Sequence, residues 1–180
     1  MKIKVLFISV SLMFIAACAD QGYEKEDTAA ILNGEEITYE DILWQYSLTA
    51  NIEDTVIGYL KQEIVILEAQ DMGIVVSDEE VEENKRLLFP GSGVSERYQK
   101  LEDKQFYEEQ ASLLGVSPED YYEVWEEKAY RSQAYMNKYI EKNFGTPAEG
   151  DDGEAWGQQI NDHIDQLFHD YIESGELIIN

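Results

Sequence analysis

The chain is poor in the residues that most catalytic and metal sites use. Its 180 residues contain one cysteine, Cys18, and two histidines, His163 and His169. One cysteine excludes an intramolecular disulfide, and the spacing of the histidines is not the i, i+4 pair with which helices bind metals. We expect both histidines to be solvent-exposed. The sequence also lacks a glycine-rich phosphate loop and a nucleophile elbow, so it predicts no enzyme, no cofactor and no metal.

Basic residues are scarce as well. Lysine and arginine together number 13 against 38 acidic residues, which gives a net charge of −25. Binding to the phosphate backbone of nucleic acids needs a basic surface, so that class of function is excluded. Electrostatic docking on anionic lipid is disfavoured for the same reason. The acidic stretch Asp151–Glu154 lacks the alternating ligands of a calcium-binding EF-hand loop. We interpret the acidity as a soluble, self-repelling surface.

The one long apolar run stands at the start of the sequence. Lys2 and Lys4 precede Val5–Ala17, an uncharged stretch that is too short for a comfortable membrane span. This arrangement is typical of a targeting segment, and we interpret residues 1–17 as a signal peptide. No further transmembrane run follows in the sequence.

The run ends in Ile-Ala-Ala-Cys at residues 15–18, which resembles the lipobox of bacterial lipoproteins. The resemblance implies cleavage before Cys18 and attachment of lipid, palmitate included, to that residue. The protein would then be anchored to the cell membrane on its extracytoplasmic side. An ordinary signal peptide with an incidental cysteine is the alternative.

Two stretches have the composition of linkers. Ala19–Thr28 is polar and lacks apolar periodicity, which predicts a flexible tether over residues 18–28. Fully extended, this tether would reach about 35–40 Å, so the domain would work close to the membrane. Gly145–Gly157 is rich in glycine and acidic residues and predicts a second linker. Residues 29–180 are expected to form one domain that contains this linker.

Apolar residues at helical spacing mark the centre of the chain. Val56, Leu60, Ile64 and Leu67 recur at steps of three and four residues, which predicts a helix that is capped by Asn51 or Asp54 and ends before Gly73. Further helices are expected over residues 38–49, 78–88, 95–114, 117–144 and 158–174.

Several of these segments together resemble a known family. They are Val56–Leu60, Ile64–Ala69, Met72–Ile74 and Val76–Val81, preceded by Ala30–Thr38 with its Asn-Gly turn. Their order and spacing resemble the N-terminal chaperone region of the SurA/PrsA group of extracytoplasmic foldases.

The resemblance implies a mainly α fold, a SurA/trigger-factor-like helical chaperone domain with a small two-stranded sheet. In that sheet Leu177–Ile179, near the C-terminus, would pair with Ala30–Leu32, near the N-terminus. Full-length members of the family carry a parvulin-type prolyl isomerase domain at the place of Gly145–Gly157, and so short a segment does not hold one. Prolyl isomerase activity is therefore not expected.

The helix expected over residues 117–144 is rich in aromatic residues. Three apolar residues can share one side of it and are expected to pack against the central helix: Trp125, Met136 and Ile140. Tyr122, Tyr130 and Tyr135 fall off that side, so we expect them to be partly exposed. Large amphipathic rings bind exposed apolar segments with little loss of entropy, which makes these three tyrosines candidate client-binding residues.

These features together favour a lipid-anchored extracytoplasmic chaperone or folding factor. It would bind unfolded or secreted polypeptides without catalysis and without nucleotide. The alternative is an envelope lipoprotein that uses the same fold as an adaptor for one dedicated protein partner, since a fold does not determine a function.

Overall fold

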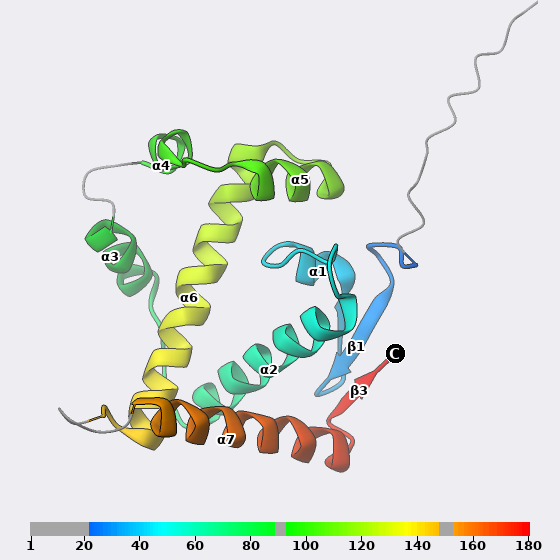
Figure 1. The fold of residues 1–180 in the computed structure, drawn as a ribbon, viewed down its shortest axis with the longest axis vertical. Helices are drawn as coiled ribbons and strands as arrows, with labels where there is room; N and C mark the ends of the chain where they lie inside the picture. Colours follow the sequence, from blue (N-terminus) through cyan, green and yellow to red (C-terminus); the bar gives the residue numbers. More distant parts are fainter. Residues whose placement is uncertain (1–21, 89–92, 148–152) are drawn as a thin grey trace, which may run out of the picture.

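The computed structural model describes residues 22–88, 93–147 and 153–180 (Figure 1). The expected signal peptide and the expected lipid attachment residue, Cys18, lie outside these ranges, as do residues 148–152 of the expected linker. The described elements are β1 (Thr28–Leu32), β2 (Glu35–Thr38), α1 (Tyr39–Leu43), α2 (Ile52–Asp71), α3 (Asp78–Leu88), α4 (Val94–Lys100), α5 (Gln105–Leu114), α6 (Pro118–Phe144), α7 (Gly153–Ser174) and β3 (Leu177–Ile179). The fold is mainly helical, as expected.

The small sheet joins the two ends of the described chain. β1 lies between β2 and β3, and both pairs are antiparallel. Asn33 and Gly34 connect β1 to β2 with φ angles of 51° and 84°, because a two-residue hairpin turn needs positive φ. β3 pairs with β1 in the register that sets Leu177 opposite Leu32. The expected pairing of the chain ends is confirmed, but the expected two-stranded sheet is wrong because β2 adds a third strand.

The central helix α2 lies where its apolar spacing predicts it. Of the two candidate caps, Asn51 is the one used, since its side-chain oxygen accepts a hydrogen bond from the Asp54 backbone N–H at 3.3 Å. Leu60 and Ile64 are almost completely buried. Gly73 follows the helix with a φ of 76°, the left-handed conformation that ends helices at low cost in glycine. α2 thus forms the axis of the core.

Two of the expected helices are shorter than their spacing predicts. α1 begins at the predicted cap, Thr38, whose side chain and backbone both bond to Asp41. It ends at Leu43, and the following residues form a loop. The helix expected over residues 95–114 is instead two helices, α4 and α5, because the backbone turns to an extended conformation at Leu101, with ψ of 130°. The Asp103 side chain then accepts from the Gln105 backbone N–H at 2.9 Å and starts α5.

Both expected linkers are shorter than predicted. Tyr23 stacks on Tyr39 with ring centroids 4.4 Å apart, and the Tyr39 N–H donates to the Asp27 carbonyl at 3.1 Å. The last residues of the expected tether are therefore packed against the domain. α7 begins at Gly153, so the end of the second expected linker is helical.

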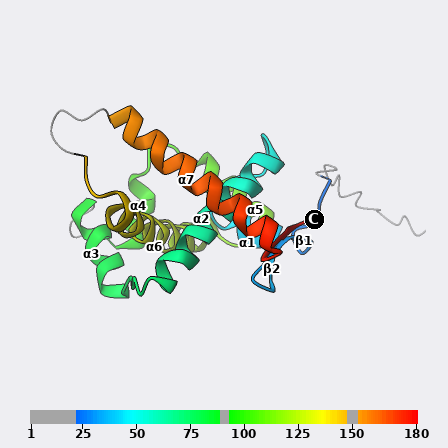
Figure 2. The same ribbon diagram turned by 90° about the horizontal axis from the view of Figure 1, so that it is seen from below.

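The core extends along α2 in two groups of buried side chains. The larger group unites the sheet with α1, α2, α5, α6 and α7 and includes Leu60, Tyr121 and Phe168. The smaller group joins α2, α3 and α6 around Val65 and Tyr139. Figure 2 shows that α7 crosses the molecule diagonally and that the sheet lies at the opposite end from α3. The two groups leave one side of α6 free of helix cover.

Candidate functional site: an aromatic hollow

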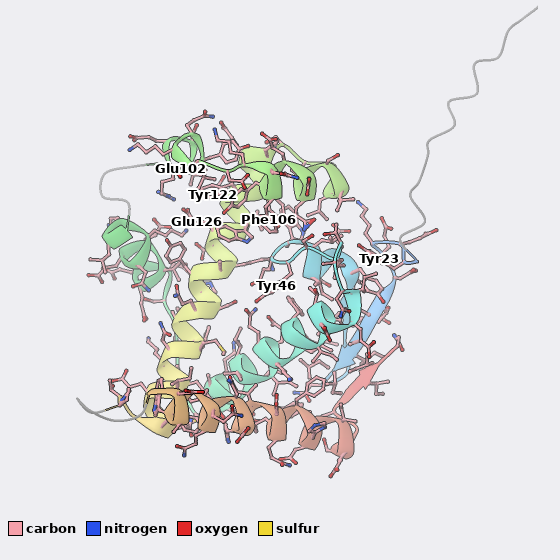
Figure 3. The ribbon with its side chains drawn as sticks, in the orientation of Figure 1. Tyr23, Tyr46, Glu102, Phe106, Tyr122 and Glu126 are labelled. Atoms are coloured by element: carbon pink, nitrogen blue, oxygen red, sulfur yellow. The ribbon has the colours of Figure 1, made fainter. Side chains whose placement is uncertain are left out.

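A hollow of about 640 Å³ opens between α6, α2, the α1–α2 loop and the α4–α5 corner. In Figure 3, Tyr46 approaches it from the loop and Tyr122 from α6. We call it the aromatic hollow. Its lining residues are Gln45, Tyr46, Gln62, Leu101, Tyr107, Tyr122, Trp125, Ala129, Tyr130, Gln133 and Met136.

α6 supplies one whole wall of the aromatic hollow. The wall residues recur at three- and four-residue steps and so share one face of the helix: Tyr122, Trp125, Ala129, Gln133 and Met136. The helix is regular because Ser117 caps it, accepting from the Asp120 N–H at 3.1 Å, and Pro118 occupies its first turn. One rigid helix therefore places the wall.

Three of the aromatic rings that line the hollow pack against one another. The Tyr107 ring lies 5.1 Å from that of Trp125 and 5.2 Å from that of Tyr122, both edge to face. The Tyr122 and Trp125 rings are 6.0 Å apart and nearly parallel. These distances lie in the favourable range for aromatic pairs, so a bound side chain meets rings that are already in place.

Hydrogen bonds hold the rings of Tyr122 and Trp125 in place. The Tyr122 hydroxyl donates to Glu126 at 2.9 Å, and the same carboxylate accepts from the Arg97 Nε at 2.6 Å. Glu126 is 1% exposed and Arg97 6%, so this ion pair is buried beneath the hollow. The Trp125 indole N–H donates to the backbone carbonyl of Gln45 at 3.3 Å. The rings thus lose little further conformational freedom on binding a ligand.

Three glutamine side chains stand among the rings. The Tyr46 hydroxyl donates to Gln62 Oε1 at 2.7 Å, and Gln62 Nε2 donates to Gln45 Oε1 at 3.2 Å. Gln133 is exposed. Within the part of the chain that the structure describes, the amide NH₂ groups of Gln45 and Gln133 have no protein hydrogen-bond acceptor. They are available to a ligand that carries carbonyl groups.

The aromatic hollow carries no charge, although 28% of the chain is charged. None of its eleven lining residues is Asp, Glu, Lys or Arg. Burial raises the pKa of Tyr107, Tyr122 and Tyr130, and nearby Glu126 adds to the effect. Burial likewise raises the pKa of Tyr46. All four phenols therefore stay neutral at physiological pH, and the hollow is an uncharged concavity on an acidic protein.

The three tyrosines proposed as client-binding residues do not form one exposed patch. Tyr122 is 2% exposed and Tyr135 9%, so the expectation of partial exposure is wrong for both. Tyr135 packs in the smaller core group beside α2 and α3. Tyr130 is half-buried and lines the hollow. Tyr122 also lines the hollow, but as a buried residue.

Of the residues expected to be core, Trp125 and Met136 do pack against the two buried groups, but neither is itself fully buried. Trp125 and Met136 are only half-buried and line the aromatic hollow, while Ile140 is also half-buried. The sequence predicted the helix correctly, but it did not predict that Trp125 and Met136 would line a hollow as well as contact the core. An apolar stripe faces whichever neighbours surround it, and α6 is surrounded on several sides by α2, α3, α4 and α5. No signal in the α6 sequence distinguishes a face that meets helices from one that meets a hollow.

The histidines do not form a metal site. His169 is exposed as expected, but the expectation is wrong for His163, whose Nε2 lies 2.8 Å from the Tyr139 hydroxyl on α6. His163 thereby helps to join α7 to α6. Among the described residues, no three His, Cys, Asp or Glu side chains gather in an arrangement that suits a metal ion.

Comparisons with known proteins give no relative. No family model, no curated protein and no solved structure matches the chain. None of the helices in the described ranges has both the length and the apolar character that are needed to cross a membrane.

Proposed function

We propose that the protein is a chaperone that holds unfolded polypeptides through short apolar segments bound in the aromatic hollow. The observation that carries the proposal is an uncharged, ring-lined concavity on a chain with a net charge of −25. Open hollows with apolar and aromatic walls and a few polar groups are the usual form of binding sites. The sequence resemblance to the SurA/PrsA group supports the same proposal.

The chemistry of the lining favours an extended peptide as the ligand. Tyr107, Trp125 and Met136 offer apolar contact to side chains without demanding one shape, since methionine adapts to its partner. The free amide groups of Gln45 and Gln133 fit backbone carbonyls, which are unpaired in an unfolded chain. Folded proteins satisfy those carbonyls internally, so the hollow discriminates in favour of unfolded segments.

The expected affinity is low and suits release without nucleotide. Burial of one or two large apolar side chains contributes about 1.5–3 kcal/mol each. Even before the costs of association, an upper value of about 6 kcal/mol corresponds to a dissociation constant of about 40 µM, so a short peptide should bind more weakly than this. A client with several such segments would be held more tightly, and each contact would still open quickly.

Suppression of aggregation tests the proposal. The purified domain should slow the aggregation of an unrelated denatured protein at near-equimolar ratio. Gln133→Glu places a carboxylate in the hollow and should abolish most of this effect. Gln159→Glu adds the same charge to an exposed position of α7 outside the hollow and should retain it.

Circular dichroism and thermal unfolding would show that both variants remain folded. Equal suppression by the two variants would contradict the assignment of the site, and no suppression by the unmodified protein would contradict the function. In a crosslinking pull-down, one abundant species in place of many clients would instead favour the adaptor function. Isomerase activity above background would contradict a purely non-catalytic function.

Attachment to the membrane is the second part of the proposal. Lipid on Cys18 would hold the chaperone at the extracytoplasmic face, where translocated chains emerge unfolded. Cys18→Ser should abolish the incorporation of labelled palmitate and release the protein from the membrane fraction. Retention of both in the variant would contradict the anchor.

A further inference from the structure

Two exposed glutamates, Glu102 and Glu108, stand next in sequence to residues that line the aromatic hollow. Leu101 lines the hollow and is followed by Glu102, and Tyr107 lines it and is followed by Glu108. Both glutamates are exposed. Figure 3 shows Glu102 at the α4–α5 end of α6, close to Tyr122 in this view. Neither glutamate forms an ion pair with another residue in the described ranges.

Most of the cations that could balance this acidity are already engaged within the protein. Lys85, Arg97, Arg131 and Lys138 pair with carboxylates of α3 or α6. Lys104, the cation nearest to the corner in sequence, lies over the Tyr98 ring at 4.9 Å from its centroid. Lys100 directly precedes Leu101 and pairs with Glu96 at 2.7 Å. Residues 100–109 contain four carboxylates and two lysines, so this side of the mouth carries a net negative charge, while the lining residues are uncharged.

We propose that the aromatic hollow selects apolar segments that are flanked by lysine or arginine. The inference rests on the proposed function and names the class of client. The uncharged centre of the segment would occupy the hollow. A basic flank would lie against the acidic surface that Glu102, between α4 and α5, and Glu108, on α5, provide; we call this surface the α4–α5 corner. A segment with acidic flanks would be repelled by the same corner, so charge complementarity gives selectivity and speeds association.

Peptides that differ only in their flanks test this inference. Three fluorescent peptides share one uncharged aromatic centre and carry lysine, serine or glutamate on both sides. Fluorescence anisotropy should show the lysine peptide binding at least about tenfold more tightly than the glutamate peptide at low salt. The difference should shrink to about twofold or less near 0.5 M salt, because the Debye length there is only about 4 Å.

The outcomes separate the inference from the proposed function. Equal affinity for all three peptides at low salt, or a preference for the glutamate peptide, would overturn the inference and leave a chaperone without charge selectivity. If none of the three binds, the proposed function itself fails. A preference that persists unchanged at high salt would also overturn the inference, since screened charges do not produce it.

A pair of double variants locates the effect. Glu102→Gln with Glu108→Gln removes two charges from the corner, whereas Glu83→Gln with Glu173→Gln removes two from exposed positions of α3 and α7. Both change the net charge equally. The corner variant should weaken binding of the lysine peptide by about threefold to tenfold and leave the serine peptide unchanged. An equal effect of both variants would overturn the role of the corner.

Discussion

α6 is attached to its neighbours by two kinds of force. Around Tyr121 the helix joins the larger core group, where apolar side chains from the sheet, α1, α2, α5 and α7 meet. Toward α3 and α4 the same helix is joined by charged pairs in addition to a few buried side chains, such as Val81 of α3 and Tyr98 of α4. We call the first region the body and the second the charged flank, which comprises α3, α4 and the α6 residues that they contact.

The charged flank contains both buried and partly exposed pairs. Arg97 of α4 and Glu126 of α6 are buried together. Lys85 of α3 is 4% exposed and pairs with Glu127 of α6 at 2.6 Å. Val81 is the only apolar side chain that α3 buries among those the structure describes. The flank therefore combines charged pairs with few buried apolar groups, whereas apolar burial dominates the body.

The buried pair of Arg97 and Glu126 fixes α4 against α6 next to the aromatic hollow. An apolar flank would gain energy by collapsing onto the exposed side of α6. Paired charges require water or defined partners, so they hold α4 in place and do not spread over the rings. The same charged pairs make the stability of the flank depend on salt, and on acid in the direction opposite to that of the body.

The largest expected effect follows from removing one member of the buried pair. Glu126→Ala removes the carboxylate that neutralises Arg97 and should lower the free energy of unfolding by about 3–5 kcal/mol. Replacing both residues, Arg97→Met with Glu126→Leu, should cost less than Glu126→Ala alone, since no buried charge is then left uncompensated. Urea unfolding measures both. A double variant as unstable as the single one would contradict the electrostatic account of the flank.

In the body, the corresponding test is a cavity at the centre of α2. Ile64 is 1% exposed, and Ile64→Ala should cost about 2–5 kcal/mol through lost burial and the cavity that remains. The loss should be nearly independent of salt in thermal unfolding, unlike losses in the charged flank. A cost below about 0.5 kcal/mol would mean that Ile64 is not in a close-packed core.

A smaller effect is expected for a partly exposed pair of the flank. Lys138 pairs with Glu80 at 2.6 Å and donates to the Val75 carbonyl at 2.9 Å. Lys138→Met should cost about 0.2–1 kcal/mol at low salt, because water screens such pairs. The cost should fall further in high salt, as measured by chemical unfolding at two ionic strengths. An equal cost at both ionic strengths would indicate lost packing rather than lost charge.

The smallest effect is a pH dependence of opposite sign in the two regions. Burial opposes ionisation of Glu127, but hydrogen bonds from Lys85 and Arg131 outweigh it and lower its pKa. Its contribution to stability is therefore present above the ordinary carboxyl pKa and is lost as pH falls through the lowered value. In the body, burial raises the pKa of Glu63 even though Gln62 and Lys128 oppose the shift. The folded body binds that proton more tightly, so mild acid stabilises it.

Hydrogen exchange, corrected for intrinsic rates, separates these two effects. As pH falls from about 6 to about 3, amides of α3 should lose protection before those of α2. Glu63→Gln should remove the gain of the body in mild acid and leave the loss in α3 unchanged. Simultaneous loss of protection in both helices would contradict the division into body and flank.

Local signals in the sequence predicted individual elements well. The steps between Val56, Leu60 and Ile64 predicted α2, and Ser117-Pro118 predicted the start of α6, because caps and apolar spacing act within a few residues. β2 was missed since Glu35 and Glu36 give it no apolar alternation, and pairing with β1 stabilises it instead. The break at Leu101 was missed for a related reason, as helical spacing continues across it.

The candidate site was only partly predictable. Tyr122 and Tyr130 were candidates and do line the hollow, whereas Trp125, Met136 and the glutamines of the hollow were not among the candidates. Gln45, Gln62 and Gln133 come from three separate parts of the chain, and no local pattern connects them. Their meeting depends on how α2 and α6 cross.

The amino-acid sequence was enough for the acidity, the order of the helices and their caps, whereas the pairing of the two terminal segments was expected from the family resemblance. The acidity, the order of the helices and their caps follow from charge and from interactions between near neighbours. Only the tertiary structure decided which side of α6 stays uncovered and which charges are buried. Both depend on packing between distant elements, where the rotation of a helix by less than one turn exchanges a core face for a binding face.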